Sequence, residues 1–97
     1  MLTAVQTKNV TETLKILAHP TRLKIVSVLL GVDSDMTICV GEIAQAINMS
    51  HSATSHQLAR LEDKGVVRAE RKGQTMCYSL NTNKTTHHLK RIITDFS

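Results

Sequence analysis

Apolar residues recur at helical spacing through the first third of the chain and predict two helices. Val10, Leu14 and Leu17 mark the first helix, which should end just before Pro20 because the residue preceding a proline disfavours helical geometry. Proline also suits the first turn of a second helix, where its missing N–H costs nothing. The apolar arc of that second helix, Leu23 to Leu30, is broad, so we expect it at the centre of the fold.

Two shorter helices joined by a tight turn are predicted after a polar loop at 31–37. Asn48 tolerates the left-handed conformation that such a turn requires, and Ser50 is a favourable N-cap for the helix that follows. Gly65 should end that helix. The positions expected to face the core are Val40, Ile43, Ala44 and Ile47 in the third helix and Thr54, Leu58 and Leu61 in the fourth.

The remaining pattern predicts a β-hairpin at 66–80 and a last helix at 84–97. The β-rich runs VVRAER and TMCYSL flank the turn residues KGQ. Because side chains alternate along a strand, Tyr78 and Cys77 should face opposite sides of the hairpin, which would leave Cys77 partly exposed.

The 97 residues are expected to form one domain, 1–97. Four helices, a hairpin and a final helix follow the order of a winged helix-turn-helix, a mainly α fold with a small β-hairpin. The helix-turn-helix would occupy 40–64 and the wing 66–80. With no Trp, one Phe and one Tyr, the core must be aliphatic and modest. Such a chain often extends its core through a homodimer.

Lys and Arg total 12 against 8 Asp and Glu, and this net charge of +4 is compatible with a nucleic-acid partner. No apolar run approaches the roughly 20 residues that span a bilayer. The first residues also lack the basic-then-apolar pattern of a secretion signal. We therefore expect a cytoplasmic protein with no membrane partner. In that reducing compartment Cys39 and Cys77 are expected to be free thiols rather than a disulfide.

The outward face of the fourth predicted helix carries short or planar hydrogen-bonding side chains: His51, Ser52, Ser55 and His56. Such groups can donate to or accept from base edges in the major groove of double-stranded DNA. A solvated helix face usually carries Glu and Lys, whereas positions 51–59 hold no acidic residue, which favours DNA contact. Candidates for contact with phosphates or the minor groove are Arg60, Arg71, Lys72 and Gln74, together with Lys64 and Arg68, for which an ordinary charged surface is an equal alternative.

Three segments resemble the ArsR/SmtB family of metal- and redox-responsive repressors: LAHPTRLKIVSVL, ICVGEIAQAINMSHSATSHQLARLEDKGVV and RKGQTMCYSL. The similarity covers about residues 14–80, and SATSHQL after CVGEIAQAI is close to the zinc-sensing members. It implies a homodimeric repressor whose first and last helices, 1–18 and 84–97, form the dimer interface. It also implies that the four outward residues contact an imperfectly palindromic operator, with the two helices about 34 Å apart. An inducer that favours the low-affinity conformer would release the DNA.

One metal site of that family is incomplete in this chain. Cys39 and Glu42 match a thiolate and a carboxylate position, but Gly41 stands at the second thiolate position. No Cys or His precedes Leu14 to supply the N-terminal ligands. Two ligands do not make a zinc site, which usually has four.

A second family site, on the terminal helix, is not matched because Lys84 stands where a ligand is required. A shifted site made by His88 and Asp95, seven residues apart on one helix face, is the alternative to a plain polar edge. His19 precedes Pro20 and is expected to cap the second helix rather than bind a metal. The usual ligand sets therefore predict no metal cofactor.

A thiol switch is the remaining candidate for a sensor, with Cys39, Glu42 and Cys77 as its residues. Cys39 begins a helix, whose N-terminus favours a reactive thiolate, whereas the Glu42 carboxylate opposes it. A buried and inert Cys39 is an equal alternative.

We interpret the chain as a DNA-binding transcriptional repressor with a thiol, redox or unknown input. One alternative is a metal-responsive repressor with a non-standard site. Another is a winged-helix protein-interaction module without DNA binding, which would place apolar residues on the outward face of the fourth helix. No paired carboxylates, nucleophile–base pair or phosphate loop at usable spacing indicates an enzyme.

Overall fold

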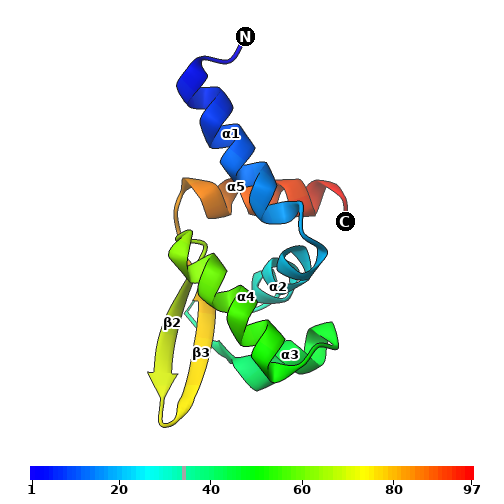
Figure 1. Cartoon of the computed structure of the whole chain (residues 1–97), viewed down its shortest axis with the longest axis vertical. Helices are drawn as coiled ribbons and strands as arrows, with labels where there is room; N and C mark the ends of the chain where they lie inside the picture. The colour runs from blue at the N-terminus through cyan, green and yellow to red at the C-terminus, as the bar shows by residue number, and fades with distance from the viewer. Residues whose placement is uncertain (34) are drawn as a thin grey trace.

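The computed structural model describes residues 1–33 and 35–97, which form five helices and a three-stranded antiparallel sheet (Figure 1). In chain order the elements are α1 (Ala4–Leu17), α2 (Pro20–Leu30), β1 (Ile38–Cys39), α3 (Val40–Ile47), α4 (His51–Asp63), β2 (Val67–Lys72), β3 (Thr75–Leu80) and α5 (Lys84–Asp95). This order confirms the winged helix-turn-helix prediction. It adds one strand, β1, which is too short for any periodicity to predict.

The core is aliphatic, as the composition requires. Its largest fully buried side chains come from α2, α3, α4 and α5 and include Ile25, Leu29, Ile43, Leu58, Leu61 and Leu89. One expected core position is wrong: Leu23 is 39% exposed. The buried stripe of α2 consists of Ile25, Val26 and Leu29, and Leu23 lies well off the centre of that stripe on the helix surface.

α1 projects away from the body of the molecule (Figure 1). The elongated shape, 48 × 22 × 22 Å, reflects this projection. Ile16 is the buried residue of α1, whereas Val5, Val10 and Leu14 are exposed along the helix. Several exposed apolar side chains on a projecting helix indicate a surface that a partner covers.

The strands are ordered β1-β3-β2, so β3 is the central strand. β1 contributes two residue pairs to it, Ile38 with Tyr78 and Cys39 with Cys77. β2 and β3 form the wing and are joined by a two-residue turn, in which Gly73 has a φ of +65°. The polar loop predicted at 31–37 precedes β1, and its Ser34 lies outside the described residues. No helix in the described part of the chain combines the length and apolarity needed to cross a membrane.

Candidate nucleic-acid interface

The turn between α3 and α4 forms as the sequence predicts. Asn48 adopts the left-handed conformation at a φ of 57°, which lets the chain reverse at the end of α3. Ser50 is the N-cap of α4, and its hydroxyl accepts a hydrogen bond from the Ala53 N–H at 3.1 Å. The Met49 thioether accepts a further hydrogen bond from the Thr21 hydroxyl at 3.6 Å, which links this turn to the first turn of α2.

The orientation of α4 also agrees with the prediction. Thr54, Leu58 and Leu61 are fully buried. The Thr54 hydroxyl donates to the Ser50 carbonyl at 2.8 Å, so its polar atom is satisfied within the helix. On the other side of α4, the side chains predicted to face outward are His51, Ser52 and His56, which are exposed, and Ser55, which is half-buried.

One side-chain pair is organised along this outward face. The Arg60 Nε donates a hydrogen bond to the His56 Nε2 at 3.2 Å, across one turn of α4. In a neutral imidazole, an Nε2 that accepts leaves Nδ1 as the donor. Arg60 is exposed, and its charge remains available to a phosphate.

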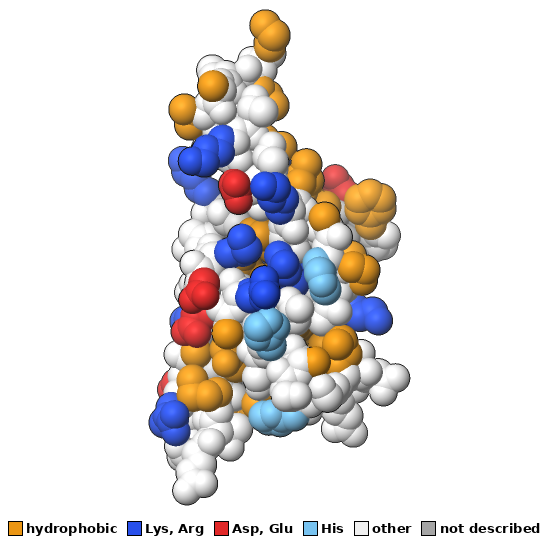
Figure 2. Space-filling model, in the orientation of Figure 1, with side chains coloured by type: hydrophobic (Ala, Val, Ile, Leu, Met, Phe, Trp, Pro, Cys, Tyr) orange, Lys and Arg blue, Asp and Glu red, His pale blue; other side chains and the backbone are white. Residues whose placement is uncertain are grey.

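The wing residues predicted to contact DNA, Arg71, Lys72 and Gln74, are all exposed around the turn at Gly73. Arg68, further from the turn, donates from its guanidinium to the Leu80 carbonyl at 3.1 Å. Figure 2 shows Lys and Arg side chains gathered over the middle of the face that α4 crosses, with histidine side chains beside and below them. This face therefore offers cations and hydrogen-bonding groups together.

Tyr78 lies where the wing meets α4. Burial raises the pKa of its phenol above the ordinary value of 10.0, and the negative charge of Glu62 on α4 raises it further. The phenol therefore stays neutral at physiological pH and adds no negative charge to the wing.

Two asparagines that the sequence analysis did not single out hold the junction between α4, the wing and α5. The Asn81 side-chain amide donates to the carbonyls of Gly65, at 3.0 Å, and Val67, at 3.2 Å. Asn83 donates to the same Gly65 carbonyl at 2.9 Å and caps α5 by accepting from the Thr86 N–H at 2.9 Å. Asn is a preferred N-cap, so the capping role of Asn83 was predictable, whereas its contact with Gly65 was not.

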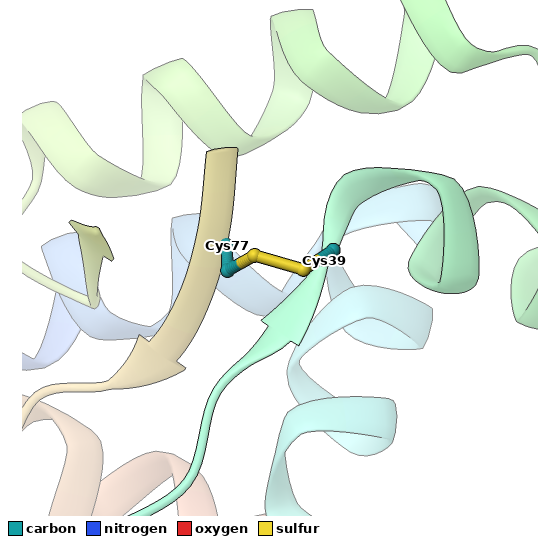
Figure 3. The surroundings of a disulfide bond; sticks show 2 residues. All are labelled: Cys39 and Cys77. Carbon is teal, nitrogen blue, oxygen red and sulfur yellow. A yellow bond between two sulfur atoms is a disulfide. The ribbon is translucent and has the colours of Figure 1, made fainter. Parts of the chain in front are cut away.

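The expectation of two free thiols is wrong. Cys39 and Cys77 form a disulfide between β1 and β3 (Figure 3). The two residues face each other because β1 pairs with β3 in this register, which the sequence did not predict. Cys77 is also fully buried rather than partly exposed, and its neighbours Tyr78 and Ser79 on β3 are buried as well. Cys39 is half-buried.

No metal-binding group of three or more His, Cys, Asp or Glu side chains is found among residues 1–33 and 35–97. Glu42 is exposed on the first turn of α3, and the sulfur of Cys39 is committed to the disulfide. His88 and Asp95 are both exposed on α5. His19 occupies the N-cap position of α2, as expected, but makes no side-chain capping hydrogen bond.

A family model described as bacterial regulatory protein, arsR family, matches residues 19–69. Among curated proteins, the chain is similar to the transcriptional repressor SdpR of Bacillus subtilis, with 44% identity over 68 residues. That alignment spans 70% of this chain and 71% of SdpR. The alignments of this chain with two further curated relatives span 56% and 65% of the lengths of those proteins.

Solved structures resemble the whole fold. The AntR antimony-specific transcriptional repressor superposes with a TM-score of 0.83 at 28% identity, over 99% of this chain and 84% of that one. The homodimeric winged helix-turn-helix DNA-binding domain Mb0332 of Mycobacterium bovis superposes with a TM-score of 0.72 at 26% identity, over 95% of this chain and 83% of that one. The similarity thus includes α1 and α5, which lie outside the part that the family model matches.

Proposed function

The chain belongs to the arsR family of bacterial regulatory proteins, and we propose that it is a cytoplasmic repressor that binds operator DNA as a homodimer. The observation that carries this proposal is the outward face of α4. His51, Ser52 and His56 project into solvent from a helix whose opposite face is anchored in the core. Their length and hydrogen-bonding capacity suit base edges in the major groove.

The wing supplies a second set of contacts. Arg71 and Lys72 would neutralise phosphates, and Gln74 would reach the backbone or the minor groove beside them. Such contacts raise affinity for any sequence, whereas the α4 side chains discriminate between sequences.

The exposed apolar side chains of α1 and α5 support the homodimer. Val5 is 69% exposed and Phe96, at the end of α5, is 90% exposed. A groove of about 730 Å³ runs between α1, α5 and the end of α4, with Leu14 and Ile92 among its lining residues. A second copy that covers these surfaces in a two-fold arrangement would bury exposed apolar side chains of both α1 helices. It would also present two α4 helices to successive major grooves, about 34 Å apart.

Fluorescence anisotropy tests the proposal. The titration uses a labelled fragment of the promoter in front of the chain's own gene and a shuffled fragment of the same length. We expect the promoter fragment to bind at least about a thousandfold more tightly, with two protomers for each site. Equal affinity for both fragments would refute sequence-specific DNA binding.

A further inference from the structure

The disulfide joins the start of the helix-turn-helix unit to the wing. Cys39 is the last residue of β1 and the N-cap of α3, whereas Cys77 lies on β3 in the wing (Figure 3). The bond spans a sequence separation of 38 residues, and the loop that it closes contains α3, α4, β2 and the wing turn. The residues proposed to contact DNA therefore all lie within the loop that this bond closes.

We infer that Cys39–Cys77 is a reversible thiol–disulfide exchange site through which low-molecular-weight disulfides and thiols regulate operator binding. The inference rests on the proposed DNA-binding function. The proposed cytoplasmic location supports it, because disulfides that form in the cytosol of mesophiles are usually transient and serve redox sensing or catalysis.

The two sulfurs differ in their access to a reagent. Cys77 is fully buried, whereas Cys39 is half-buried on an edge strand of two residues. Exchange should therefore begin at Cys39. An oxidant disulfide RSSR is attacked by the Cys39 thiolate, which forms a mixed disulfide and releases one RSH. The Cys77 thiolate then attacks the Cys39 sulfur, closes the internal bond and releases the second RSH. Two thiols are thus oxidised to one disulfide while RSSR is reduced to two RSH, and the two thiol protons end on the RSH products.

Each cysteine lies next to a part of the chain that positions the DNA-binding residues. Cys39 directly precedes Val40, whose buried side chain fixes the start of α3 in the core. Cys77 pairs with Glu70 in the wing, and the next two pairs towards the turn contain Arg71 and Lys72. The covalent link thereby restricts the position of the wing relative to the helix-turn-helix.

Without the bond, β1 would be held by its two residue pairs with β3 and by the packing of Ile38 against the core. The Cys39 side chain makes no capping hydrogen bond to α3 that would replace the link. The wing and α4 should then sample a wider range of relative positions. Binding to DNA would have to restrict that range, so the reduced form should bind the operator more weakly.

The exchange chemistry is tested by intact-mass measurement after incubation of the reduced protein with glutathione disulfide. Wild type should lose the mass of two hydrogens. Cys77→Ala should gain one glutathione at Cys39, whereas Cys39→Ser should react far more slowly because its remaining thiol is buried. Failure of wild type to form the internal disulfide, or equally fast modification of the two variants, would overturn the inference.

The regulatory consequence is tested by operator affinity of the oxidised and reduced wild type. We expect the oxidised form to bind about tenfold more tightly, a ratio within the usual range of coupling between sites. The double variant Cys39→Ser, Cys77→Ala should bind equally with and without reductant. Equal affinities of the two wild-type forms would overturn the inference but leave the proposed function intact. Absence of specific binding by both forms would refute the proposed function and the regulation of DNA binding, while the mass measurement would still decide the exchange chemistry.

Discussion

Arg60 and His56 lie one turn apart on α4 and are joined by a hydrogen bond of 3.2 Å from the guanidinium Nε to the imidazole Nε2. The pair fixes which imidazole nitrogen is the donor and holds the guanidinium along the helix. Both side chains belong to the proposed DNA-contacting face, so each prepares the other for binding.

We predict that these two side chains act as a unit in operator binding. His56→Ala and Arg60→Ala should each weaken binding, and the double variant should lose less than the sum, with a coupling energy of about 1 kcal/mol. Anisotropy titrations of the four proteins give this value. The control combines His56→Ala with Lys8→Ala. Lys8 lies on α1, away from the wing (Figure 1), so the effects of these two changes on binding free energy should add. Simple additivity of the first pair would contradict a shared role.

The wing cations should determine much of the salt dependence. Replacing Arg71 and Lys72 by Ala should make the plot of log K against log salt less steep, by about 0.9 for each phosphate that is no longer neutralised. Affinity for operator and shuffled DNA should fall by similar factors. Lys8→Ala also removes a positive charge but should leave the slope unchanged. An unchanged slope in the wing variant would place the phosphate contacts elsewhere.

The apolar side chains of α1 and α5 should be required for the dimer. Val5→Asp and Phe96→Asp should each shift the protein towards a monomer in sedimentation velocity, because a charge would be buried without a partner. Met36→Asp is the matched control, since Met36 is 56% exposed but lies in the loop before β1. A monomeric Met36 variant, or dimeric Val5 and Phe96 variants, would argue against this interface.

Reduction of the disulfide should destabilise the fold without unfolding it. With the cysteines separated by 38 positions in the sequence, the chain-entropy treatment gives a loss of about 4 kcal/mol in the free energy of unfolding. Urea titrations with and without reductant measure the difference. The variant that lacks both cysteines should be insensitive to reductant. An identical midpoint for oxidised and reduced wild type would contradict this prediction.

Much of the fold was predictable because helical spacing survives in the sequence. The spacing puts Ile43 and Ile47 on one face of α3, and Leu58 and Leu61 on one face of α4. All four side chains are buried. Asn48 and Ser50 mark a turn by local backbone chemistry, which needs no knowledge of the rest of the chain.

The features that escaped prediction depend on contacts between distant segments. β1 is two residues long and exists only because it docks on β3. That docking brings Cys39 to Cys77. The helices α2 and α3 also contact β3, and Cys77 and Tyr78, which alternation places on opposite faces, are both buried. The contacts of Asn81 with the Gly65 and Val67 carbonyls likewise join segments that no local pattern connects.

The most direct test of the account is selection of preferred sequences from random duplex DNA by wild type and by His56→Ala and Ser55→Ala. We predict that wild type selects an imperfect palindrome with half-sites one helical turn apart, and that each variant relaxes preference at particular base pairs within each half-site. Both variants should retain the melting temperature and the affinity for shuffled DNA of wild type. Selection of the same sequence, with undiminished preference at every position, by all three proteins would contradict the claim that this face of α4 reads the operator.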